Sequence, residues 1–493
     1  MLLPLKIPAG IYRNGTNFQA AGRWYDCNLV RFFEGTIRPF GGWQAAATSV
    51  VAGAPRGLFA WRDNTFNRWC AIGTHSHLYA FNGGSIYDIT PAGFTTGRPS
   101  SFPGVGYGFG PYGSAVYGAS PVVANVLDAT TWSFDNWGQF LVGCSTSDGK
   151  LYQWELSSIA LAQVIANAPT NCSSLIVSAE RYLIALGAGG DPRRVSWSTQ
   201  EDNTDWTPTS LNTAGGLNLV TNGRIRSARR VRGQIIIWTD SDIHALNYLG
   251  PPFIYGTERI GGFCGIISAN AMAVIDSGAV WMGVNSFFSY DGAISDIPCD
   301  VSDYVFSDFN SEQAAKVYAG LNTKFGEVIW FYCSAASDEI DRYVIYNYRE
   351  KHWSIGSTLS RTCWTDASAF PFPLAADAFG FLYQHETGWT DSGNQIGGLR
   401  YLTAGPVQLA DGDKVIDIMQ VVPDEKSQGQ VELQFSAQFT PEGTQYFYGP
   451  FPMSSYVDVR LSGRQISPTI NGASDADWRV GQIRFETVQG GRR

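Results

Sequence analysis

The chain has 493 residues, too many for one average domain, and its 34 Lys and Arg residues are outnumbered by 43 Asp and Glu residues. The net charge of −9 and a pI near 5.1 argue against a protein that binds nucleic acid tightly by neutralising many phosphates. No stretch approaches the roughly 20 consecutive apolar residues of a transmembrane helix. The first residues contain two prolines and no apolar run long enough for a signal peptide, so we expect synthesis in the cytoplasm.

The composition predicts an all-β protein. The chain has 55 Gly residues and 14% aromatic residues but only 16% charged residues, against roughly 25% in typical soluble domains. Aromatic residues fit a pleated, half-buried surface, and glycine supplies the positive-φ turns between short strands. The eight cysteines are scattered without short spacings and only five histidines are present, which predicts neither a zinc cluster nor a disulfide scaffold.

After an N-terminal arm of β-strands over residues 1–50, a short strand pattern recurs. In this pattern any residue is followed by Leu or Phe, then Tyr or Phe, then any residue, and last an aromatic residue or His. It occurs at 77–81, 150–154, 286–290 and 381–385. Two copies continue into Asn82-Gly83 and Asp291-Gly292, which are strong hairpin signals because both central residues of that turn need positive φ. Another strand pair precedes each copy, so one unit has four short strands.

Four short strands within roughly 30–50 residues are typical of a β-propeller blade. Less regular units lie at 174–206, 224–250 and 316–356. Together the units predict a six- or seven-bladed β-propeller-like domain over residues 51–400, in which ring closure covers the strand edges. The expected helices are short, near 159–166 and 311–315.

Residues 91–131 interrupt the repeats with a loop in which glycine alternates with aromatic residues. Such a loop is commonly a disordered connector, whereas dense aromatic residues are typical of a contact surface, and both interpretations stay open. The candidate subunit-interface or channel contacts in this loop are Tyr107, Phe109, Tyr112 and Tyr117.

The densest run of charge lies in one expected strand. A period of two places Arg224, Arg226, Arg230 and Arg232 on one face, and these four are further candidate interface or channel contacts. In an acidic protein we expect this stripe to pair with carboxylates, between blades or across a subunit interface. A solvated face and transient contact with phosphate are the alternatives.

After residue 402 the pattern changes to strict alternation of apolar and polar residues. Each such strand has one buried and one solvent-exposed face, which predicts a C-terminal β-sandwich domain over residues 401–493. The alternating segments are 414–419, 430–435, 456–461 and 481–486.

The sequence offers few patterns for catalysis. The segment from Gly108 to Gly113 matches G-x-G-x-x-G, but Pro111 precludes the strand-to-helix turn that would bind pyrophosphate. No P-loop, G-x-S-x-G or H-E-x-x-H pattern occurs. His75 and His77 share a strand face, yet no acidic residue lies beside them, so a satisfied surface pair is favoured over a metal site. We expect no metal, no cofactor and no enzymatic activity.

A carbohydrate-binding or glycan-cleaving β-propeller is the alternative function. The two carboxylates of such a glycosidase come from different blades and leave no local spacing to recognise. The repeated S-x-D-x-G-x-x-W box of sialidase-type propellers is missing from this chain.

Several stretches of fold-bearing residues stand out together, at 24–32, 38–43, 194–198, 205–206, 239–253, 262–265 and 479–485. With the overall layout they resemble the tail-nozzle proteins of short-tailed bacteriophages, also called packaged-DNA stabilisation proteins. The resemblance covers most of the chain.

The resemblance implies a structural subunit of the virion tail, assembled in the host cytoplasm. It implies a homohexamer that lies below the head-to-tail adaptor, contacts tail fibres, spikes or a distal tail plug, and surrounds double-stranded DNA without sequence-specific binding. The acidic composition is compatible with this role, because each added phosphate contact would raise affinity and therefore friction. The family supplies no catalytic residues to carry over.

Overall fold

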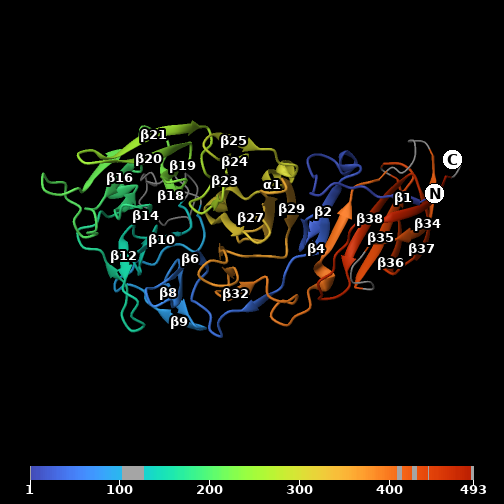
Figure 1. The fold of residues 1–493 in the computed structure, drawn as a ribbon, viewed down its shortest axis with the longest axis horizontal. Helices are drawn as coiled ribbons and strands as arrows, with labels where there is room; N and C mark the ends of the chain where they lie inside the picture. The colour runs from blue at the N-terminus through green and yellow to red at the C-terminus, as the bar shows by residue number, and fades with distance from the viewer. Residues whose placement is uncertain (1, 103–126, 408–413, 425–429, 442, 490–493) are drawn as a thin grey trace, which may run out of the picture.

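The computed structural model describes residues 2–102, 127–407, 414–424, 430–441 and 443–489. Its regular structure is almost entirely β-strand, so the all-β prediction is confirmed (Figure 1). Within the described ranges, no helix has the length and apolar character needed to cross a bilayer.

Seven four-stranded antiparallel sheets follow one another through the described chain from residue 55 to residue 385. The first four are β6 to β9 (Pro55–Arg62, Arg68–Thr74, Leu78–Asn82, Ser85–Asp88), β10 to β13 (Trp132–Trp137, Phe140–Ser145, Leu151–Trp154, Gln163–Val164), β14 to β17 (Ser174–Val177, Leu183–Leu186, Arg194–Trp197, Gly215–Asn218) and β18 to β21 (Ile225–Val231, Gln234–Thr239, Asp242–Gly250, Ile254–Gly262). The next three are β22 to β25 (Met272–Ile275, Gly278–Met282, Phe287–Tyr290, Ile294–Ile297), β26 to β29 (Tyr318–Asn322, Glu327–Tyr332, Arg342–Asn347, His352–Gly356) and β30 to β32 (Cys363–Thr365, Leu374–Ala376, Leu382–His385) with β5 (Trp43–Ala45).

The recurring sequence pattern marks the third strand of a sheet. Its four copies form β8, β12, β24 and β32, each paired with the strand that precedes it in the chain. The hairpin predicted after β8 is present, but its central residues are Gly83 and Gly84, with φ values of +56° and +90°, and Asn82 is the last residue of the strand, paired with Ser85.

The first strands of the sheets lie side by side around a centre, which makes the fold β-propeller-like (Figure 1). β6 packs against β10, β10 against β14, β14 against β18, β22 against β26, and β26 against β30. The sheets of β18 and β22 meet through the buried Trp238 and Trp281, whose ring centroids are 5.9 Å apart. β30 packs against β6, so the sheets form a closed ring.

The N-terminal arm completes sheets that lie far from it in the chain. β5 is the fourth strand of the last sheet in the ring, where Trp43 pairs with His385. β1 (Leu2–Pro4) pairs with β39, and β2 (Trp24–Asn28) pairs with β33. The arm therefore connects the ring to the C-terminal sheets.

Two more sheets are formed by the C-terminal segment and the arm (Figure 1). They lie against each other, because Phe435 of one and Phe485 of the other are buried with ring centroids 6.0 Å apart. One has the order β1, β39 (Arg484–Gln489), β34 (Ile416–Val422), β37 (Val457–Gly463), and the other β2, β33 (Tyr401–Ala404), β38 (Gln465–Gly472), β35 (Val431–Gln438), β36 (Tyr446–Pro452). The four segments predicted from alternation correspond to β34, β35, β37 and β39.

Helix is confined to short segments of the described chain. α1 spans Ser302–Ser307, and a 3-10 helix spans Ser311–Lys316, near the helix expected at 311–315. The helix expected at 159–166 is absent, and that segment contains β13 instead. This two-residue strand pairs with β12, and the backbone hydrogen bonds to the sheet outweigh the helical preference of the local sequence.

A buried ion cluster lies where the arm meets the ring. The hairpin of β3 (Val30–Phe33) and β4 (Thr36–Pro39) carries Arg31, whose Nη2 lies 2.6 Å from Glu386 Oε1 and whose Nε lies 3.1 Å from Glu327 Oε1. The guanidinium is sandwiched between the rings of Phe40 and Phe325, 4.0 and 3.7 Å from their centroids. One cation therefore compensates two carboxylates in a site closed to water.

We expect Glu327→Gln to weaken the pH dependence of stability. Burial raises the pKa of Glu327 to about 7 from its ordinary 4.5, with Arg31 opposing the rise and Glu386 adding to it. Because the folded chain holds a proton that the unfolded chain releases, the free energy of unfolding falls as pH rises from 4.5 to about 7. Removing the carboxyl group should abolish up to about 3 kcal/mol of that fall, measured by urea denaturation across this range. Glu312→Gln, at an exposed position, is the control, and an unchanged slope in Glu327→Gln would show that Glu327 stays ionised throughout.

Candidate functional site at the mouth of the ring

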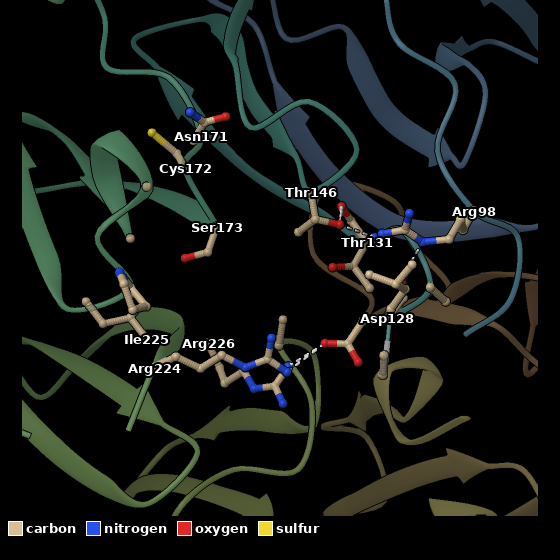
Figure 2. A pocket seen from close by; sticks show the side chains of 17 residues that line it. Arg98, Asp128, Thr131, Thr146, Asn171, Cys172, Ser173, Arg224, Ile225 and Arg226 are labelled. Atoms are coloured by element: carbon tan, nitrogen blue, oxygen red, sulfur yellow. Dashed lines mark hydrogen bonds and ion pairs between the residues drawn. The ribbon is translucent and has the colours of Figure 1, made fainter. Parts of the chain in front are cut away.

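A cavity of about 440 Å³ lies where several first strands of the ring begin (Figure 2). Its walls come from the segments that lead into β10, β14, β18, β22 and β26, so five sheets contribute to one site. Its charged lining residues are Arg98, Asp128, Arg224 and Arg226, and its main neutral polar ones are Thr131, Thr146, Asn171 and Ser173.

Two arginines converge on one carboxylate in this cavity. Arg224 Nη2 and Arg226 Nη1 lie 2.8 and 3.0 Å from the same oxygen, Oδ2 of Asp128 (Figure 2). Arg224 also lies 3.5 Å from Asp240 and is half exposed, whereas Arg226 is mostly buried. The Nε of Arg226 is buried and has no hydrogen-bond partner.

The cavity is locally positive. Arg98 Nε donates to the backbone carbonyl of Asp128 at 3.4 Å, which brings a third guanidinium to the site. Burial lowers the pKa of Arg226, Arg224 adds to the decrease and Asp128 opposes it, but a guanidinium stays protonated in proteins. Three cations and the two carboxylates of Asp128 and Asp240 therefore lie together, which leaves one net positive charge at this site in a chain whose net charge is −9.

A second carboxylate lies deeper in the ring, beside a cavity of about 200 Å³ that is lined by β6, β10, β14 and β18. Asp135 accepts hydrogen bonds from Arg230 Nη2 at 3.0 Å and from the backbone N–H of Val177 at 2.9 Å. Arg229 and Tyr318 line the same cavity. Burial raises the pKa of Asp135, and Arg230 opposes the rise. This carboxylate connects three first strands, those of β10, β14 and β18.

The predicted arginine stripe is divided among several partners. A β-bulge interrupts the strand at Arg226, so the alternation does not hold along the whole segment. Arg224, Arg226 and Arg230 pair with carboxylates of another sheet in the same chain, which is the inter-blade form of the predicted pairing. Arg232 has a φ of +52° and donates instead to the backbone carbonyls of Ser277 and Asp291.

The ends of the Gly and aromatic loop are anchored next to the cavity. Phe102 and Leu127 exchange two backbone hydrogen bonds of 2.9 Å, and Ser101 exchanges two with the side chain of Gln313, at 3.0 and 3.2 Å. Outside the described residues lie the four aromatic candidates of this loop, Tyr107, Phe109, Tyr112 and Tyr117.

Sequence reasoning identified the arginines but missed their carboxylate partners. Asp135 lies in the strand Trp132–Trp137, and an acidic residue inside such an aromatic strand is a signal of a buried, paired carboxylate. Asp128 and Arg98 carry no comparable signal, because their positions depend on how residues 97–102 and 127–131 pair with each other.

The described residues hold no cluster of three or more His, Cys, Asp or Glu side chains that could bind a metal. The ring of His77 stacks on Tyr79 with centroids 5.6 Å apart, and its Nδ1 lies 2.8 Å from Ser76 Oγ. All eight cysteines are unpaired.

We expect Asp135→Ala to destabilise the fold by about 1–3 kcal/mol, because it leaves the buried N–H of Val177 without an acceptor. Arg230→Ala should cost less, about 1–2 kcal/mol, since the buried Asp135 carboxylate loses this half-exposed cation but keeps its hydrogen bond from Val177 and the nearby guanidinium of Arg229. Urea denaturation of the two variants measures the difference. Equal losses would mean that the ion pair, and not the connection to β14, determines the effect.

No family model and no curated protein matches the chain. Among solved structures it is similar to one titled "Streptogramin B lyase structure", with a TM-score of 0.41 and 9% identity over 70% of this chain and 97% of that one. It is also similar to "Crystal Structure of Mitotic Checkpoint Complex", with a TM-score of 0.42 and 9% identity over 72% of this chain and 93% of that one. Neither similarity says anything about the activity of this chain.

Proposed function

We propose that the chain is a structural subunit of a bacteriophage tail, in the nozzle or tail tube below the head-to-tail adaptor. In this proposal the seven sheets of the ring are the blades of a seven-bladed β-propeller, and the two C-terminal sheets form a β-sandwich. A homo-oligomer, which we take to be a hexamer, forms a ring-shaped channel that retains and then releases double-stranded DNA.

The interlocking of the chain by its N-terminal arm carries this proposal. β1 and β2 are strands of the C-terminal sheets, and β5 is a strand of the ring, so one arm holds both parts. The apolar core that contains Trp330 of the ring and Phe435 of the C-terminal sheets is continuous. Such a unit resists bending and shear, which a subunit of a conduit requires.

Exposed apolar side chains support assembly with other chains. Phe253 at the tip of the β20–β21 hairpin is 74% exposed, and Phe263 just after β21 is 99% exposed. Leu249 is exposed in the same hairpin as Phe253, and Val220 lines one cavity together with Phe263 at the other end of β21. Exposed large apolar side chains of this kind are typical of surfaces that a partner covers.

The charge distribution fits a wall past which DNA slides. Arg224, Arg226 and Arg230 each have a carboxylate partner in the same chain, so the positive charge that remains for phosphates is confined to the cavity of Arg224 and Arg226. Together with the net charge of −9, this predicts that the wall of the assembled ring binds double-stranded DNA only weakly at physiological salt.

The test is the assembly state of the purified chain, measured by mass photometry alone and with a head-to-tail adaptor complex of a short-tailed phage. We expect rings, or chains docked on the adaptor, and we expect removal of residues 402–493 to impair assembly. Because that truncation also removes the partners of β1 and β2, the double variant Leu249→Ser/Phe253→Ser is the sharper test. Phe379→Ser, at an equally exposed position of another sheet, is its control. Monomers alone, with and without adaptor, would count against the proposal.

A further inference from the structure

We propose that the cavity at the mouth of the ring binds a carboxylate-bearing sugar, such as a uronate unit. This binding involves no bond cleavage and does not require assembly of the chain into a ring. Three features of the described residues support it: the sign of the local charge, the hydrogen-bonding capacity that remains in the lining, and the size of the cavity.

The charge favours an anionic ligand. Arg98, Arg224 and Arg226 lie beside the carboxylates of Asp128 and Asp240, so one positive charge remains uncompensated at the cavity. Both of the arginines that bind Asp128 use the same oxygen, Oδ2, and the buried Nε of Arg226 donates to no acceptor. A guanidinium has five N–H donors in a planar fork that matches a carboxylate, so Arg224 and Arg226 retain donors for a second carboxylate.

The neutral lining favours a ligand with hydroxyl groups over a small inorganic anion. Asn171 and Ser173 lie across the cavity from the arginines, and Thr131 and Thr146 lie above Asp128 (Figure 2). The Asn171 amide makes no side-chain hydrogen bond among the described residues, and the Ser173 hydroxyl donates to Leu186 O at 3.1 Å but keeps its acceptor lone pairs. A sugar ring places hydroxyl groups around its edge, where these side chains can bind them.

The size of the cavity fits a ligand larger than one ion. A volume of about 440 Å³ lies within the range of roughly 300–1,000 Å³ that is usual for small-molecule sites. Among the described residues, the lining contains charged and hydrogen-bonding side chains and no aromatic ring. The contribution of these charged residues predicts that affinity falls as salt rises.

Isothermal titration calorimetry at low ionic strength tests the proposal with three probes. Glucuronate carries both the ring and the carboxylate, glucose carries the same ring without the charge, and acetate carries the charge without the ring. We expect glucuronate to bind at least roughly tenfold more tightly than either of the others, because each lacks one of the two sets of contacts. Glucuronate binding no tighter than glucose, or acetate binding as tightly as glucuronate, would overturn the proposal.

Variants connect the binding to the cavity. Arg224→Gln and Arg226→Gln should each weaken glucuronate binding by roughly tenfold or more. Arg224 is half exposed, so its variant is expected to fold even if Arg226→Gln does not. Arg349→Gln is the matched control, since Arg349 is also half exposed and lies between β28 and β29, outside the lining.

Asp128→Asn gives an effect of the opposite sign. It releases Arg224 and Arg226 from their internal carboxylate, so binding of both glucuronate and acetate should become several-fold tighter. A purely structural role of Asp128 would leave affinity equal or lower. Equal affinities in wild type, Arg224→Gln and Arg349→Gln would place the binding elsewhere and contradict the assignment.

Discussion

Arg31→Met is expected to destabilise the chain by about 3–5 kcal/mol, one of the two largest effects of a single substitution that the structure predicts. Arg31 is the single cation between the buried carboxylates of Glu327 and Glu386, whose side chains are 2% and 8% exposed. Methionine fills a similar volume against Phe40 and Phe325 but leaves the buried carboxylate of Glu386 without its cation, and Glu327, whose pKa burial raises to about 7, loses the partner that favours its charged form. A buried charge that loses its partner keeps the full cost of leaving water. The measurement is the midpoint and slope of urea denaturation at neutral pH.

The hairpin that carries Arg31 also provides the control. Arg38 lies directly opposite Arg31 in the antiparallel register of β3 and β4, and its carboxylate partner, Glu34, is largely exposed. Arg38→Met should therefore cost about 1 kcal/mol or less. The triple variant Arg31→Met/Glu327→Gln/Glu386→Gln should recover much of the lost stability, because it removes the uncompensated charges. If the triple variant were as unstable as Arg31→Met, lost packing against the two Phe rings would be the cause.

Trp43→Ala is expected to cost about 3–5 kcal/mol and to loosen the closure of the ring. Trp43 is 3% exposed and lies in β5, the strand that the N-terminal arm adds to the last sheet. Its ring lies 5.5 Å from that of His385, and the guanidinium of Arg361 lies over it at 5.0 Å. Alanine leaves a large cavity at the place where a distant part of the chain closes the ring. We expect a lower denaturation midpoint together with faster proteolysis in the segment that follows β5.

Gln44→Ala is the matched control, since Gln44 is the next residue of the same strand and its side chain is exposed. Its effect should stay within about 0.5 kcal/mol. If Gln44→Ala accelerated proteolysis as much as Trp43→Ala does, β5 would be weakly bound to the sheet regardless of which side chain is removed. Unchanged proteolysis in Trp43→Ala would show that the backbone pairing of β5 with β32 is sufficient to close the sheet.

The candidate site was only half predictable from the sequence. The arginines form a dense run within nine residues, so Arg224, Arg226 and Arg230 could be identified by local spacing. Their partners Asp128 and Asp135 lie 95 to 98 residues away in the chain, as the hydrogen bonds to them show. Local patterns carry no information on such a separation. The bulge at Arg226 likewise depends on the pairing of β18 with β19, so the alternation of polar and apolar residues does not predict it.

The sequence by itself determined what depends on neighbouring residues: the all-β class, the four third strands of the recurring pattern, and the alternating C-terminal strands β34, β35, β37 and β39. These follow from a side-chain period of two and from turn residues that accept positive φ, both of which act over a few residues. Only the tertiary structure decided that β1, β2 and β5 of the N-terminal arm belong to three separate sheets, and that Arg31, Glu327 and Glu386 form one cluster. Backbone hydrogen bonding and charge burial select such partners in space, and they do so without regard to distance along the chain.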